Sequence, residues 1–130
     1  MRKIIRKISK DEIKKNLYFY KAYVLHIHDG DTITILVDLG IDTYRKIRLR
    51  LYGIDTPELS GEQKKAGQKS KSYTSRKINK KDIYIETIKD KTGKYGRYLV
   101  NVWILNKNKK EYECLNDMLL KYNLAKVLLY

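Results

Sequence analysis

The sequence has little of what cross-links or stiffens small proteins, and few acidic residues for its size. Its 130 residues include one Cys, one Pro and two His, and 15 acidic residues against 29 Lys and Arg. A single Cys excludes a disulfide framework and a thiolate zinc site. No apolar run approaches the ~18 residues of a membrane span, and residues 1–15 lack the continuous apolar centre of a secretory signal. We therefore expect a cytoplasmic protein with no membrane partner, secreted only if a leader has been removed.

The formal charge of +14 makes nucleic acid the first class of partner to consider. Residues 64–81 carry eight cations and no acid, and residues 1–16 carry seven cations against two acids. Two other interpretations stay open: a solvated basic face, and an anionic membrane surface, which the lack of a strong apolar face weakens. With 42% hydrophobic residues the chain is too apolar for a disordered tail. Charge thus predicts a partner class and no chemistry.

The length fits one domain, and we expect a basic arm or short helix over 1–16 followed by a single domain over 17–130. Alternation and β-forming residues predict strands over 18–28, 32–38, 45–52, 82–88 and 97–105. Helices are predicted within 62–78 and over 113–122, and Thr56-Pro57-Glu58 is typical of a helix start. Asn123 is placed to end the second helix, and 90–96 reads as a turn or loop.

The predicted order is three strands, a helix, two strands and a helix. Five short strands cannot bury a core as an open sheet, and closing them into a barrel removes the edges. We therefore predict a mainly β protein with helices, a five-stranded OB-fold barrel with the order β-β-β-α-β-β-α. This fold often binds nucleic acid.

Three short segments carry residue types that phosphodiester hydrolysis needs. They are Asp29-Gly30-Asp31-Thr32, the stretch 50–58 (RLYGIDTPE) and Lys94-Tyr95-Gly96-Arg97. A hard divalent cation bound by oxygens can hold both a water and a phosphate oxygen. Such oxygens could come from Asp31, Asp55 and the carbonyl of Thr56.

A carboxylate can activate the water, and guanidinium groups can neutralise the charge that builds on the phosphate. Glu58 is the candidate base, and Arg50 and Arg97 are the candidate cations, because the planar fork of Arg meets two phosphate oxygens at once. Each segment alone is more typical of a plain turn, a helix start or a hairpin, and the charges could form ordinary surface ion pairs. Their conjunction in this order favours a nuclease site.

Together these segments resemble the staphylococcal nuclease (thermonuclease-like) family, over about residues 20–130. The closing Asn123-Leu124-Ala125-Lys126-Val127 resembles the family's segment after its second helix. The resemblance implies an OB barrel and calcium-dependent hydrolysis of DNA and RNA that leaves 3′-phosphate ends. It also leads us to expect a monomer that prefers single strands.

Carried over to this sequence, the resemblance assigns a role to each matching residue. The catalytic positions are Arg50, Glu58 and Arg97; the Ca²⁺ ligands are Asp31, Asp55 and the carbonyl of Thr56; Asp29 tunes the metal site; Lys94 and Tyr95 contact a terminal phosphate of the bound nucleotide. There are departures from the family. Leu129 stands where the family has an aromatic residue, the segment between Glu58 and the first helix is short, and the 130 residues show no third, C-terminal helix.

Other conspicuous residues have plainer interpretations. His26 and His28 share a strand face without an evident third metal ligand, so we expect surface polar residues. Cys114 and Trp103 are expected in the core. The arm could bind nucleic acid, cover the barrel or have no particular role. The rivals to a nuclease are an OB module that binds without cutting and a basic interaction protein that keeps only the fold.

Overall fold

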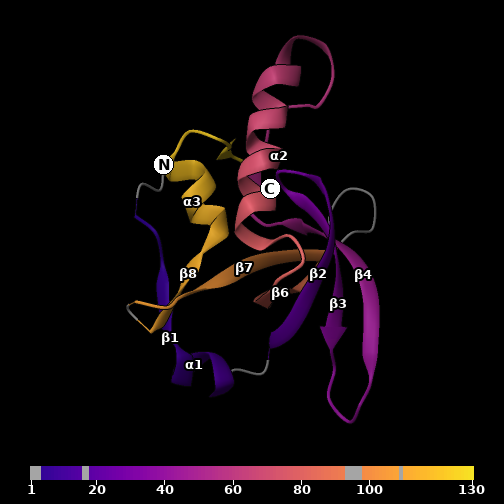
Figure 1. Ribbon diagram of the computed structural model, residues 1–130, viewed down its shortest axis with the longest axis vertical. Helices are drawn as coiled ribbons and strands as arrows, with labels where there is room; N and C mark the ends of the chain where they lie inside the picture. Colours follow the sequence, from indigo (N-terminus) through magenta and orange to yellow (C-terminus); the bar gives the residue numbers. More distant parts are fainter. Residues whose placement is uncertain (1–3, 16–17, 93–97, 109) are drawn as a thin grey trace.

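The computed structural model describes residues 4–15, 18–92, 98–108 and 110–130 (Figure 1). Its strands are β1 (Lys7–Ser9), β2 (Phe19–Asp29), β3 (Thr32–Asp38), β4 (Tyr44–Leu51), β5 (Ile54–Asp55), β6 (Asp82–Thr92), β7 (Tyr98–Asn106), β8 (Glu111–Cys114) and β9 (Lys126–Val127). Its helices are α1 (Lys10–Lys15), α2 (Lys64–Ile78) and α3 (Leu115–Lys121), with a 3₁₀ turn over Gly61–Gln63 before α2. No described helix has the length and apolar character needed to cross a membrane.

Five strands close into the predicted barrel. Strands β2, β3 and β4 form an antiparallel meander, and β6 pairs with both β2 and β7. The barrel closes through parallel pairing of β4 with β7, in which Leu49 lies opposite Tyr98 and Leu51 opposite Val100. The OB-fold barrel and the order of its main elements are therefore confirmed.

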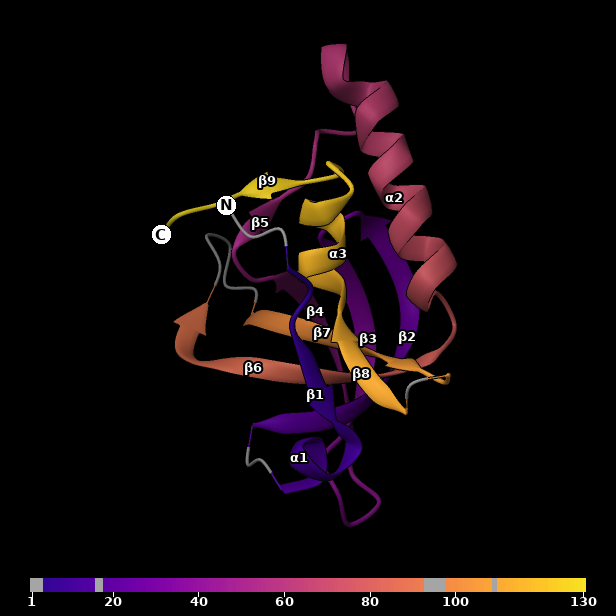
Figure 2. The same ribbon diagram turned by 90° about the vertical axis from the view of Figure 1, so that its left-hand side faces the viewer.

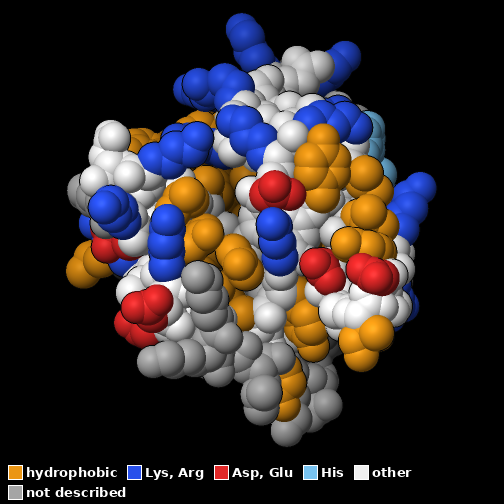
Figure 3. Space-filling model, turned by 60° about the horizontal axis from the view of Figure 1, so that its bottom comes forward, with side chains coloured by type: hydrophobic (Ala, Val, Ile, Leu, Met, Phe, Trp, Pro, Cys, Tyr) orange, Lys and Arg blue, Asp and Glu red, His pale blue; other side chains and the backbone are white. Residues whose placement is uncertain are grey.

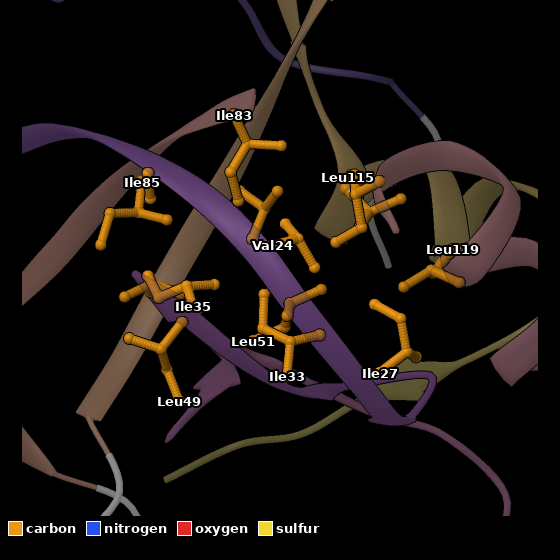
Figure 4. Packing of buried hydrophobic residues seen from close by; sticks show 14 of the residues in the cluster. Val24, Ile27, Ile33, Ile35, Leu49, Leu51, Ile83, Ile85, Leu115 and Leu119 are labelled. Atoms are coloured by element: carbon orange, nitrogen blue, oxygen red, sulfur yellow. The ribbon is translucent and has the colours of Figure 1, made fainter. Parts of the chain in front are cut away.

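Alternation along each strand fills the barrel with aliphatic side chains (Figure 4). Val24, Ile33, Ile35 and Leu51 are fully buried, while most of their neighbours along the strands are exposed or half-buried. Each such side chain contributes about 1.5–3 kcal/mol relative to exposure. The interior therefore holds the ends of β3 and β4 in fixed register.

Several strand and helix boundaries differ from the predicted ones. Strand β3 has the predicted bounds and β2 and β4 lie within one residue of theirs, but β6 runs to Thr92, so the turn predicted over 90–96 is wrong for its first residues; residues 93–96 lie outside the description. Thr56-Pro57-Glu58 begins no helix. The helix predicted over 113–122 corresponds to α3, which begins only at Leu115 because residues 111–114 pair with β7 as strand β8. Asn123 takes the left-handed conformation just after it, with φ 58°, as predicted.

The short strands β5 and β9 pair with each other, with Ile54 opposite Val127. Leu128 N–H adds a hydrogen bond to the carbonyl of Gly53 at 2.9 Å. The pairing depends on a contact between segments more than 70 positions apart, which local patterns do not reveal. It brings the C-terminal segment to the end of β4.

The N-terminal arm covers one side of the barrel (Figure 2). Strand β1 pairs antiparallel with β8, with Lys7 opposite Glu113. In α1, Ile13 is buried in a small cluster with Trp103 and Cys114, which confirms the core positions expected for the latter two. Of the three roles left open for the arm, covering the barrel is the one its described residues fulfil.

Cationic side chains lie widely over the surface. On the face shown in Figure 3 they occupy much of the upper half, with hydrophobic side chains exposed between them. On β4 the exposed cationic residues include Arg45, Lys46 and Arg48.

Candidate active site

The site lies where the β2–β3 turn meets the end of β4. Thr32, the first residue of β3, pairs with Arg50 near the end of β4. The carbonyl of Asp31, one residue earlier, accepts a hydrogen bond from Leu51 N–H at 2.8 Å. Strand pairing alone therefore brings the first two predicted segments together.

The Arg50 guanidinium lies between two carboxylates. One terminal nitrogen, Nη2, is 2.9 Å from Oδ1 of Asp55 and 3.3 Å from Oδ2 of Asp31. Its Nε is buried and has no hydrogen-bond partner among the described residues. Burying a donor without a partner costs free energy. An anionic ligand that accepted a hydrogen bond from Nε would remove that cost.

Asp31 is the most strongly perturbed acid of the site. Its residue surface is only 3% exposed, and its carboxylate accepts hydrogen bonds from Thr32 Oγ1 at 3.1 Å and from Thr56 N–H at 3.0 Å. Burial raises the pKa of Asp31 to about 6 from an ordinary 3.8; Asp29 adds to the rise, and Thr56 N–H and Arg50 oppose it. Negative charge is thus in excess here, and a bound cation would relieve it.

The donor set fits a hard divalent cation in an open site. Asp31 and Asp55 offer carboxylate oxygens and Thr56 a backbone carbonyl, the ligand types that Ca²⁺ prefers. Within the described ranges no three His, Cys, Asp or Glu side chains gather as a metal-binding group. A cation held here would therefore complete its shell with water or substrate oxygens. Asp29 lies beside the site, where its Oδ1 accepts the Asp31 N–H at 3.1 Å.

Glu58 shares a groove with Asp55. The groove has a volume of about 230 Å³ and is walled by 55–58 on one side and by Asn123–Lys126 on the other. The backbone N–H of Glu58 donates to Oε1 of Gln63 at 3.1 Å, and its side chain is exposed. The second predicted segment therefore presents Asp55 and Glu58 to one solvent-filled space.

Helix α2 positions this segment through small buried residues. A Cβ atom at Gly67 would lie 2.2 Å from the carbonyl oxygen of Glu58, so the helix can approach only because position 67 has no side chain. Thr74 Oγ1 donates to the carbonyl of Gly30 at 2.8 Å, and Ser70 Oγ donates to the carbonyl of Leu124. A helix that appears poor in apolar residues therefore packs through glycine and hydroxyl side chains.

These supporting residues were not singled out by the sequence. The signal that could have found them is the recurrence of small residues at 67, 70 and 74, at helical spacing. Their contacts tie α2 to the Asp29–Asp31 turn and to the segment that carries Glu58. The helix is thus a scaffold for both acidic segments.

The third predicted segment cannot be placed. Lys94, Tyr95 and Arg97 lie outside the described residues. Strand β7 begins directly afterwards at Tyr98, opposite Leu49, one residue before Arg50. Strand pairing and hydrogen bonds bring together Asp29, Asp31, Arg50, Asp55 and Thr56 from the predicted set. Glu58 shares a groove with Asp55 and Thr56.

At the family's aromatic position, Leu129 is 87% exposed. The ring of the next residue, Tyr130, stacks on Tyr52 at 5.1 Å between centroids. The His pair is a surface feature, as expected: His26 is exposed, and His28 is half-buried with Nε2 2.7 Å from Thr34 Oγ1.

Comparison with known proteins agrees with this arrangement. The sequence model of a family described as "Staphylococcal nuclease homologue" matches residues 48–130. An uncharacterized protein of Methanocaldococcus jannaschii is 29% identical over 129 aligned positions, which cover 83% of this chain and 59% of that protein. The protein ParB of Escherichia coli is 33% identical over 84 positions, which cover 65% of this chain and 42% of ParB. The alignments thus cover about half the length of these relatives.

Proposed function

Since the chain belongs to the family of staphylococcal nuclease homologues, we propose that it is a calcium-dependent nuclease. It hydrolyses phosphodiester bonds of DNA and RNA and leaves 3′-phosphate ends. The observation that carries this proposal is the Arg50 guanidinium held between Asp31 and Asp55, with a buried Nε that has no hydrogen-bond partner among the described residues. A phosphate oxygen is the acceptor that this donor lacks.

In this proposal Asp31, Asp55 and the carbonyl of Thr56 hold Ca²⁺, and Asp29 supports Asp31. When bound, the ion supplies Lewis-acid stabilisation of negative charge on a phosphate oxygen. Arg50 fixes the phosphate and neutralises the charge that develops on it, which is worth about 3–4 kcal/mol per donor. Arg97 is proposed as the second guanidinium, and Lys94 and Tyr95 as contacts to a terminal phosphate.

Glu58 is proposed as the general base. Its exposed carboxylate takes a proton from a water molecule, whose oxygen then forms a bond to phosphorus. The bond from phosphorus to the 5′-oxygen breaks, and that oxygen leaves with a proton from solvent. Its position in the groove beside Asp55 supports this role.

A second candidate is an OB module that binds nucleic acid without cutting it. One observation favours it: a single Arg50 nitrogen engages both proposed metal-binding carboxylates. If that arrangement persists with substrate, the acids are neutralised by the arginine and recruit no metal. The two candidates differ in whether Ca²⁺ binds and whether the strand is cut.

The test is cleavage of end-labelled single-stranded DNA and RNA by the pure chain, with Ca²⁺ and with a chelator, followed by identification of the product ends. We expect cleavage with Ca²⁺ only, 3′-phosphate products, and a loss of about 10²–10⁴-fold in rate for Glu58→Gln. The matched control is Glu62→Gln, which removes an exposed acid from the nearby 3₁₀ turn. Salt-sensitive binding without any cleavage would support the binding module instead.

A further inference from the structure

Residues of α2, of α3 and of the N-terminal arm line a second groove; Figure 2 shows how these three elements are arranged. The volume of the groove is about 480 Å³, within the range of ligand sites. We call it the lysine–tyrosine groove, defined by Tyr73, Lys77, Lys121 and Tyr122, with Ile5 and Met118 also lining it. None of these residues belongs to the site around Arg50.

The two tyrosines form an open aromatic surface. The rings of Tyr73 and Tyr122 are 6.0 Å apart between centroids and inclined by 46°, so they are not closed face to face. Tyr122 is 54% exposed although it lies directly after a buried helix. An exposed ring at a groove wall offers a face on which a planar group can stack.

Cations border both rings. Lys77 Nζ lies 5.6 Å from the centroid of Tyr73, and Lys121 Nζ lies 5.7 Å from that of Tyr122. No carboxylate within the described ranges forms an ion pair with either ammonium group. These two charges are therefore available to an anion from solution.

The acid that lines the groove is already engaged. Glu113 lies 3.9 Å from Lys7 Nζ through Oε2, and its Oε1 accepts a hydrogen bond from Asn106 Nδ2 at 3.1 Å. Tyr73 and Lys77 belong to the stretch 64–81, which carries eight cations and no acid. The charge of the groove is thus complementary to a chain of phosphates.

We propose that the lysine–tyrosine groove binds a single strand of nucleic acid, with one base stacked on Tyr122 and Tyr73 and phosphates on Lys77 and Lys121. Alternation of aromatic faces and cations is what an unpaired strand requires, since its bases are free to stack. The inference deepens the proposed function and rests on it for the identity of the ligand.

The groove is placed to continue the path of a strand from the active site. Tyr122 lines it, while the next residue, Asn123, lines the groove that contains Glu58. Leu124, which lines the groove that contains Glu58, accepts a hydrogen bond from Ser70 of α2 through its carbonyl. Tyr73 lies ten positions after Gln63, which precedes α2 directly, about 15 Å along the helix. Only strands of several nucleotides can therefore occupy both grooves.

The test is binding of a fluorescein-labelled 20-nucleotide oligo-dT to the full chain in a chelator, followed by fluorescence anisotropy over a range of salt concentrations. Tyr122→Ala is expected to weaken binding about fivefold or more at every salt concentration. Tyr122→Phe should restore it, because stacking needs the ring and not the hydroxyl. The double variant Lys77→Ala/Lys121→Ala should lower the slope of log affinity against log salt by about 1.4, about 0.7 per lost phosphate contact.

Matched controls lie elsewhere on the surface. Tyr44→Ala removes a tyrosine of similar exposure, 57%, and Lys10→Ala/Lys107→Ala removes two exposed lysines. Wild-type affinity in the groove variants, or equal losses in the controls, would overturn the proposal. A third result would also overturn it: polyglutamate binds only when Lys77 and Lys121 are present, while the double variant binds oligo-dT as tightly as wild type. The groove would then be a site for an acidic peptide.

The two proposals can fail separately. If the wild-type chain cuts nothing with Ca²⁺ but the groove variants lose affinity as expected, the nuclease proposal is wrong and the groove stands. If the wild-type chain cuts and the groove variants bind normally, the groove proposal is wrong and the nuclease stands.

Discussion

Two arginines lie against buried aspartates in this protein, and they differ in how fully the fold uses them. Arg6 donates to both carboxylate oxygens of Asp117, through Nε at 2.8 Å and Nη2 at 3.2 Å. Its Nη2 also contacts Asn101 Oδ1 and Cys114 Sγ. Arg50 engages two carboxylates through one nitrogen and leaves a buried Nε without a described partner.

The difference supports a structural role for Arg6 and is consistent with the reactive role proposed for Arg50. The Arg6 pair ties the arm to α3, and both Nε and Nη2 of Arg6 donate to groups of the protein. The Arg50 centre has a buried donor without a partner among the described residues. It also has an acid, Asp31, whose pKa is raised to about 6, chiefly by burial. Incomplete internal pairing is what a site for an external anion and cation requires.

The largest expected effect comes from the Arg50 centre. Arg50→Lys should lower kcat/KM for single-stranded DNA by about 10²–10³-fold, because a point charge cannot replace the planar fork. Arg48→Lys, an exposed change two residues away on β4, is the control. Equal rates for wild type and Arg50→Lys in a steady-state assay would remove Arg50 from the chemistry.

The next effect concerns stability and pH. The pKa of Asp31 is raised in the folded chain, so the folded state holds the proton more tightly than the unfolded state. Protonation of Asp31 therefore stabilises the folded state fully below pH 3.8, and this stabilisation is lost as the pH rises through about 6. The free energy of unfolding changes by about 3 kcal/mol over this range. Urea unfolding in a chelator should show that Asp31→Asn removes this decline relative to wild type.

The exposed acid Asp42 provides the matched control for that comparison. Asp42→Asn should keep the decline of stability between pH 4 and 7. An Asp31→Asn profile parallel to that of wild type would contradict the assignment of the raised pKa to Asp31.

A smaller effect is expected at the structural pair. Arg6→Met leaves the buried Asp117 carboxylate without its main partner, and we expect a loss of about 2 kcal/mol in the free energy of unfolding. Fully buried pairs lose more, but the Arg6 side chain is 39% exposed. The rate per folded molecule should not change. A variant that is fully stable but slow would reverse the distinction between the two arginines.

The smallest effect is stabilisation by the metal. At Ca²⁺ concentrations ten times Kd, the free energy of unfolding should rise by about 1.4 kcal/mol, and a chelator should abolish the gain. Asp31→Asn should lose this response, whereas Arg6→Lys should keep it. If Ca²⁺ still raised the thermal midpoint of Asp31→Asn, the metal would bind somewhere other than the Arg50 centre.

Strand alternation predicts the barrel well because each strand has one buried face. Arg50 and the Asp29–Asp31 turn could also be brought together from the sequence, since both flank the β3–β4 hairpin. The sequence does not predict strand β8, because the register of this strand depends on β7 and the arm. The helix predicted over 113–122 therefore begins two residues before α3 does. The pairing of Arg6 with Asp117 spans 111 positions and leaves no local pattern.

Helix α2 shows a different limit. Its buried face is built from Gly67, Ser70, Thr74 and Ile78, so hydrophobic periodicity gave only an approximate position for it. What these residues do is visible only in their contacts to the carbonyls of Gly30 and Leu124. Lys94, Tyr95 and Arg97 lie outside the described residues, so their roles stay predictions.

The hydrogen atom that stands in place of a side chain at position 67 sets how closely the segment bearing Glu58 lies against α2. Any larger group there would meet the Glu58 carbonyl and push that segment off the helix, without altering a single charge. Among relatives that retain every acid and arginine, the residue at this one helical position should therefore divide those that cut from those that only hold a strand.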